Sequence, residues 1–207
     1  MVTATERTLE QTPPPAASAE SGRPIAHLNA RISAYLADSV ILLAFILLFA
    51  ALGGLQVLLA TNWGEGDPSD TAIVALIAIF SGGSLLSWTA LNVALMRWRG
   101  QTTGKYVLGI KTVCEDGSSL TVGRVLLRWF ALHPLLFHPF LLVPSMSLAL
   151  LTLDFLLSPL GLITAIALAL LTVASLVVNL LAMSFDGKRR ALYDRLAGTV
   201  VVHFDQG

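Results

Sequence analysis

The chain has 207 residues, of which 55% are hydrophobic and only 13% are charged. The apolar residues stand in long blocks instead of recurring on one face of each helix, which is typical of a protein that crosses a membrane several times. Cys114 is the one cysteine in the sequence, so a disulfide within the chain is excluded and no second thiol exists for a metal site. We expect no metal, no cofactor and no nucleic-acid partner.

The basic residues of the sequence are grouped, although the formal net charge is zero. All thirteen Lys and Arg residues fall within Arg7 to Arg31, Arg97 to Arg128, and Lys188 to Arg195. Cytoplasmic segments of membrane proteins are enriched in Lys and Arg, so each of the two intervals between these groups should cross the bilayer an even number of times. The pattern predicts a multi-pass protein of the cell inner membrane with both termini in the cytoplasm.

The N-terminal residues 1–24 are rich in Thr, Ala, Glu and Pro and contain almost no large apolar side chains. Such a segment cannot bury enough apolar surface to offset the entropy that it would lose on ordering. We predict a disordered cytoplasmic tail over 1–24, followed by a four-helix transmembrane domain over 25–207.

The two apolar intervals are each long enough for two membrane-spanning helices of at least ~20 residues. Four crossings in the second interval, Val125 to Met183, would need helices of only about 15 residues, which are too short. Small residues at 81–84 favour close packing of the second span against another helix. The prediction is an all-α membrane protein with spans at 32–60, 72–96, 125–143 and 161–183, in which 145–160 connects the last two spans at the outer surface.

A small cap is expected on the cytoplasmic face. Lys105 to Cys114 is rich in β-branched and apolar residues, Asp116-Gly117 is typical of a turn, and 120–122 resumes the pattern, so a β-hairpin is predicted. Thr199 to Val202 could add a strand to this hairpin. A short helix over Ala191 to Leu196, ending at Gly198, completes the amphipathic cap.

Two charges lie at the start of the first span. Arg31 and Asp38 are seven residues apart, which places them on one helix face about 10 Å apart along the axis. Ionisable groups at the edge of the hydrocarbon layer are costly unless they snorkel, pair or line water. In a structural interpretation, Arg31 snorkels to lipid phosphates, and Asp38 pairs with Arg31, with Arg128 or with a backbone amide of the loop. In a functional interpretation, Asp38 is a cation or proton site.

Other polar side chains are expected at a similar depth, namely Asn92, Arg128 and Asn179. Together with Asp38 they could line a polar pocket facing the cytoplasm, and oxygen-rich pockets suit hard cations. Hydrogen bonding between helices is the alternative role of both Asn residues. Lys188, Arg189 and Arg190 form the basic run most suited to anionic lipid head groups, with plain positive-inside topology as its alternative.

Several motifs, taken in order, resemble the RDD family of small membrane proteins. They are Arg31 with Asp38, Gly100 to Lys105 with Leu108 to Ile110, Asp116-Gly117, Leu127-Arg128, and Ala191 to Thr199. The family is named after one Arg and two Asp, which map by motif onto Arg31, Asp38 and Asp194. The sequence departs from the family pattern at Thr103, where Pro is usual, and at Tyr193, where His is frequent.

The resemblance implies two functions. Some RDD proteins are reported as cation/proton antiporters, in which case Asp38 would carry the ion and Arg31 and Asp194 would set its surroundings. Others look like accessory subunits, so the alternative is a non-catalytic scaffold or assembly subunit that binds another membrane protein or anionic lipid. An enzyme is not expected, because no nucleophile, base and orienting group occur together. Four spans without an inverted repeat are few for a transporter, so a homo-oligomer or a membrane-protein partner is expected besides the lipid bilayer.

Overall fold

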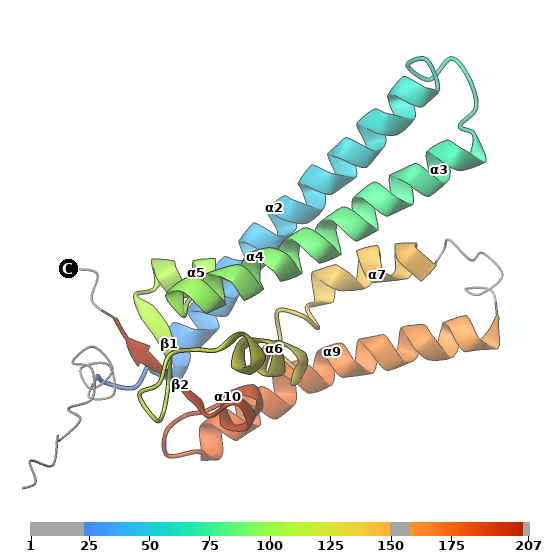
Figure 1. Cartoon of the computed structure of the whole chain (residues 1–207). Helices are drawn as coiled ribbons and strands as arrows, with labels where there is room; N and C mark the ends of the chain where they lie inside the picture. Colours follow the sequence, from blue (N-terminus) through green and yellow to red (C-terminus); the bar gives the residue numbers. More distant parts are fainter. Residues whose placement is uncertain (1–22, 150–157, 205–207) are drawn as a thin grey trace, which may run out of the picture.

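The computed structural model describes residues 23–149 and 158–204, and Figure 1 shows them in sequence colours. Within these residues, three helices are long and apolar enough to cross a membrane. They are α2 (Leu28–Ala60), the segment Asp70–Arg99, and α9 (Pro159–Phe185). These three correspond to the predicted spans 32–60, 72–96 and 161–183, and most of their apolar side chains are exposed on the surface of the isolated chain. The tail predicted over 1–24 lies almost wholly outside the described residues.

Local sequence explains where these helices begin and end. Ser69 accepts a hydrogen bond from the amide of Ala72 at 3.2 Å and so caps the start of the second segment. Ser158 caps α9 in the same way, and Pro159 occupies the first helical position, where its missing N–H costs nothing. Gly100 ends the second segment in the left-handed conformation, with φ of 69°.

The second segment contains a turn of π-helix, η1 (Ala78–Gly82), between α3 (Asp70–Ile77) and α4 (Gly83–Arg99). Its small residues allow the close packing that the sequence predicted. A Cβ atom at Gly83 would collide with the ring of Phe49 on α2, and one at Gly53 of α2 would lie 2.7 Å from Leu76. The first two spans therefore form an antiparallel helical pair in direct contact.

The predicted third span, 125–143, is wrong as a single helix. α6 (Val122–Phe130) is followed by the irregular segment 131–138, then by the 3₁₀ turn η2 (Pro139–Leu141) and α7 (Leu142–Ala149). Pro134 and Pro139 lack amide hydrogens and disfavour helical conformation in the residue before them, which explains the interruption. The predicted connecting segment 145–160 is helical at its start, in α7, and lies partly outside the described residues.

Side chains from neighbouring helices bond to backbone carbonyls of the irregular segment. Trp88 of α4 donates its indole N–H to the carbonyl of Leu135 at 3.0 Å, and Asn179 of α9 donates to the carbonyl of Leu132 at 2.8 Å. Non-helical backbone is tolerated near a membrane only where protein groups take its hydrogen bonds in this way. Trp88 also belongs to the main apolar core with Leu42, Trp129, Leu135 and Leu141.

The small sheet differs from the predicted hairpin. β1 (Ile110–Cys114) pairs antiparallel with β2 (Thr199–His203), with Thr112 opposite Val201. The strand predicted over 199–202 is thus confirmed, whereas 120–122 is not its neighbour, because Thr121 caps α6 by accepting the amide hydrogen of Arg124. Ile25 forms a bridge to Val202, so the start and the end of the described chain lie together.

We use the term cap for the five short elements at this end: α5 (Thr103–Val107), β1, α6, α10 (Leu192–Ala197) and β2. α5 packs against α2, while α10 packs against α6 and α9. In Figure 1, α2 and α9 approach each other at the cap and run apart toward their far ends, with α7 between them. The cap therefore bridges helices that diverge through the rest of their length.

Candidate functional site

Asp194 of α10 is the centre of a buried charge cluster. Its Oδ2 lies 2.7 Å from Nη1 of Arg31 on α2, and its Oδ1 lies 2.7 Å from Nη2 of Arg128 on α6. The amide of Ala191 and the hydroxyl of Thr199 also lie within hydrogen-bonding distance of the carboxylate, both at 3.3 Å. One carboxylate thus joins α2, α6 and α10 and caps its own helix.

The environment of Asp194 favours its ionised form. Burial alone would raise the pKa of the Asp194 carboxyl, but the positive charges of Arg128, Arg31 and Lys105 outweigh burial and hold the pKa below its ordinary value. A buried carboxylate is stable only when its oxygens are fully bonded, and here both oxygens are.

Asp38 belongs to a second arrangement. Its two oxygens accept hydrogen bonds from the hydroxyl of Thr102 and the amide of Gly104, both at 2.6 Å. Gly104 is required here, because a Cβ atom at this position would collide with the carbonyl of Ala34 on α2. Asp38 therefore holds the N-terminus of α5 against α2. A backbone amide of the loop was one of the three partners that the structural interpretation considered for Asp38.

Arg31 does not pair with Asp38, and its side chain does not extend outward to the head-group layer as the structural interpretation assumed. Its side chain is only 6% exposed and is held by Asp194. Arg31 and Asp194 therefore meet in space, while Asp38 binds the neighbouring helix α5.

Lys105 is a buried cation that the sequence analysis did not propose as a site residue. Its Nζ donates to the hydroxyl of Thr112 at 3.1 Å, and Arg128 donates to the same hydroxyl at 2.6 Å. Burial lowers the pKa of Lys105 well below its ordinary value, and the charges of Arg128 and Arg31 lower it further against the opposing effect of Asp194 and Asp38. Its place in the Gly100 to Lys105 motif could have identified it.

The two predicted Asn residues take different places. Asn92 donates to the carbonyl of Trp88 in its own helix at 3.0 Å and does not reach the Asp194 cluster. Asn179 donates to the irregular segment, and its Oδ1 accepts from the amide of Leu192 at 3.0 Å. Asn179 thus joins α9 to α10, which is the bonding between helices considered for it.

The basic run after α9 is bound to the protein. Lys188 and Arg190 pair with Glu115 at 2.8 and 2.9 Å, and Arg190 also pairs with Asp186. Arg189 lies 2.7 Å from Nδ1 of His27. We call Glu115 with Lys188 and Arg190 the exposed cluster, because the Lys188 side chain is 58% exposed.

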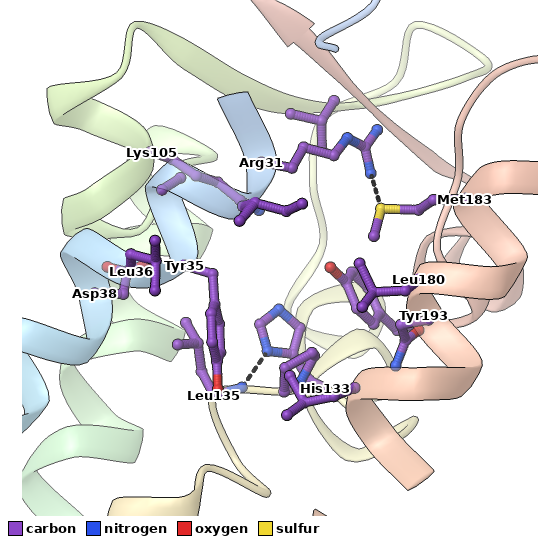
Figure 2. A pocket seen from close by; sticks show the side chains of 16 residues that line it. Arg31, Tyr35, Leu36, Asp38, Lys105, His133, Leu135, Leu180, Met183 and Tyr193 are labelled. Carbon is purple, nitrogen blue, oxygen red and sulfur yellow. Dashed lines mark hydrogen bonds between the residues drawn. The ribbon is translucent and has the colours of Figure 1, made fainter. Parts of the chain in front are cut away.

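A cavity of about 270 Å³ lies between α2, α9 and the irregular segment. Figure 2 shows Arg31 and Lys105 on one side of this cavity and Tyr35 and His133 on the other. Met183 lies next to Arg31, and Tyr193 lies next to His133. The remaining lining is largely apolar, and it also includes Asp38 and Asn179. Nη1 of Arg31 is used by Asp194, whereas its Nε and Nη2 are buried and have no hydrogen-bond partner in the described structure.

The two departures from the RDD pattern fit their positions. Thr103 is the first residue of α5, a position that tolerates Pro without requiring it. The ring of Tyr193 packs 4.4 Å from that of His133 and lies 5.0 Å from the Arg128 guanidinium. Among the described residues, no group of three His, Cys, Asp or Glu side chains could hold a metal ion.

Comparison with known proteins agrees with these motifs. A sequence model of the RDD family matches residues 25–198, which include Arg31, Asp38 and Asp194. No significant match is found among curated proteins or among solved structures. Because the matched residues cover most of the sequence, this multi-pass membrane protein belongs to the RDD family.

Proposed function

We propose that this RDD-family membrane protein binds an anion at the cap end of its helices and that Arg31 is the residue that receives it. The observation that carries the proposal is Arg31 itself: it lines the cavity, and two of its guanidinium donors, Nε and Nη2, are buried without a hydrogen-bond partner in the described structure. A buried donor without a partner costs about 1–3 kcal/mol, and more for a charged group. An anion bonded to Arg31 would remove this cost.

The charges around the cavity also support an anion. Arg31, Arg128 and Lys105 face two carboxylates, Asp38 and Asp194, and the oxygens of both carboxylates are already bonded within the protein. A guanidinium offers planar paired donors that match phosphate and carboxylate groups, and Lys105 adds a compact positive charge at the same wall.

Cation or proton transport through Asp38, which the family resemblance implies, has less support. Hard cations need several oxygen ligands, and a cation at Asp38 would have to compete with the hydroxyl of Thr102 and the amide of Gly104. It would also lie near Lys105 and Arg31. For a scaffold that binds another membrane protein, no single surface of the described chain stands out from the apolar helix faces that contact lipid.

The test uses inorganic phosphate with the purified protein in zwitterionic detergent at constant ionic strength. Phosphate should raise the unfolding temperature saturably, as a ligand of the folded state does. Arg31→Lys keeps a positive charge opposite Asp194 but removes the planar donors, so phosphate affinity should fall about tenfold. Arg124→Lys is the matched control, because Arg124 pairs with Asp116 on the exposed side of the cap and should not affect phosphate.

Two results would overturn the proposal. One is equal phosphate affinity in the wild type and the Arg31→Lys variant. The other is a protein that sodium or potassium stabilises and phosphate does not, with the stabilisation abolished by Asp38→Asn. This second result would favour the cation function instead.

A further inference from the structure

We infer that the anion is the head group of a phospholipid from the adjoining leaflet, which enters the cavity sideways between α2 and α9. This inference rests on the proposed function and names the ligand of that same site. It follows from the distribution of polarity and exposure around the cavity, from the depth of its opening along the helices, and from its volume.

The largely apolar lining of the cavity includes a few buried polar residues and several exposed apolar ones. Arg31, Asn179 and Tyr193 are all at least nine-tenths buried. At the edge, Ile32 and Leu36 of α2 are 39% and 58% exposed, and Leu180 of α9 is 40% exposed. These exposed positions lie on two of the helices that are long and apolar enough to span the membrane, so they face acyl chains.

The opening lies near the cap ends of α2 and α9, where we expect the lipid head groups. Leu36 stands about 12 Å along α2 from Leu28, and Leu180 about 8 Å along α9 from Phe185, at 1.5 Å per residue. The head-group layer on each side of a bilayer is roughly 5–8 Å thick, from the difference between its total and its hydrocarbon thickness. A lipid beside α2 and α9 can therefore present its phosphate to Arg31 without leaving the leaflet.

Neither α2 nor α9 has the other as its main packing partner. α2 packs against the second apolar segment and α5, and α9 packs against α10 and α7. α2 and α9 diverge from the cap outward, with α7 between them (Figure 1). An acyl chain attached to a head group at Arg31 would leave the cavity past the exposed side chains of Leu36 and Leu180.

The volume of the cavity decides how much of the lipid enters. Pockets that enclose a whole drug-sized ligand measure roughly 300–1,000 Å³. At about 270 Å³, this cavity can take a phosphate head group and the first part of one chain, but not a complete phospholipid. Leu176 and Met183 would contact the chain, while Arg31 and Lys105 would bind the phosphate.

The experiment measures which lipids remain bound to the protein. The protein is reconstituted into nanodiscs containing equal amounts of phosphatidylglycerol and phosphatidylcholine, released into detergent and analysed by native mass spectrometry. The wild type should retain phosphatidylglycerol in preference to phosphatidylcholine, and Arg31→Lys should lose this preference. Leu36→Trp should block the opening and lose most of the retained phosphatidylglycerol without touching the charge cluster.

Leu47→Trp is the matched control, because Leu47 is an equally exposed leucine of α2, at 60%, outside the cavity lining. It should retain phosphatidylglycerol like the wild type. If Leu36→Trp also retains it fully, sideways entry is wrong.

A separate arm adds inorganic phosphate in lipid-free detergent and distinguishes the two proposals. Phosphate binding that depends on Arg31, without preference for phosphatidylglycerol, would overturn the lipid inference and leave the anion site standing. If neither phosphate nor phosphatidylglycerol binds, both proposals fail.

Discussion

Two clusters in this protein each place one carboxylate between two basic side chains, but in opposite surroundings. In the buried cluster, Asp194 lies between Arg31 and Arg128, and its side chain is completely buried. In the exposed cluster, Glu115 lies between Lys188 and Arg190, and its side chain is 26% exposed. Both carboxyls have a pKa below the ordinary value. The comparison teaches that the number of ion pairs does not indicate their importance, because loss of a partner is costly only where water cannot replace it.

Replacing Asp194 should have the largest effect. Asp194→Asn leaves Arg31 and Arg128 buried beside a neutral amide, and the loss of one partner from a buried pair costs about 3–5 kcal/mol. We expect this decrease in the free energy of unfolding, measured by denaturant titration in detergent micelles. Asp116→Asn is the control, since Asp116 pairs with Arg124, its side chain is 53% exposed, and its replacement should cost far less. A loss under about 1 kcal/mol for Asp194→Asn would show that the clusters do not differ.

The buried cluster was only partly predictable from the sequence. Arg31 and Asp194 are 163 residues apart, and only the family motifs indicated that they act together. The pairing of β1 with β2 was predicted only in part, since Thr199 to Val202 was expected as an added strand, while the turn pattern at Asp116-Gly117 favoured 120–122 as the first neighbour of β1. Lys105 was missed because a single Lys in a polar loop is ordinarily solvent-exposed.

The broken third span shows the opposite case, in which the necessary residues were visible but were outweighed. The high apolar content of 125–143 favoured a transmembrane helix, although His133-Pro134 and His138-Pro139 lie within it. Two prolines five residues apart, with residues before them that avoid helical conformation, end the helix instead. For the three apolar segments without such an interruption, the predicted helix ends lie within a few residues of the observed ones. The side of the membrane on which the cap lies stays a prediction.

A pH titration of Lys105 should give an intermediate effect and sharpen the contrast between the clusters. Because its pKa in the folded protein lies well below the ordinary 10.5, the unfolded chain holds this proton more tightly than the folded one. The resulting destabilisation is complete below the folded-state pKa and disappears as pH rises toward 10.5. The free energy of unfolding should thus increase with pH in this window, by at most about 1.4 kcal/mol per pH unit.

The variant Lys105→Met isolates this contribution from the other groups that titrate at high pH. Its free energy of unfolding should rise less steeply with pH than that of the wild type. If the free energy of unfolding depends on pH equally in the wild type and in Lys105→Met, the pKa of Lys105 is not lowered in the folded protein.

Replacing Glu115 should have the smallest effect, and its dependence on salt separates the two clusters most directly. Glu115→Gln removes the partner of Lys188, but Arg190 keeps Asp186 at 2.9 Å, so the loss should be at most about 1 kcal/mol. The hydrogen bond from Lys188 and the charges of Arg190 and Lys188 lower the pKa of Glu115, so this stabilisation is present above pH 4.5 and is lost as pH falls.

At 1 M salt the screening length is about 3 Å, and the difference between Glu115→Gln and the wild type should vanish. The difference for Asp194→Asn should persist at 1 M salt, because ions and water do not reach a carboxylate with no exposed surface. If both differences respond equally to salt, the cluster at Asp194 is wetted and cannot be the dry, bonded centre that holds α2, α6 and α10 together.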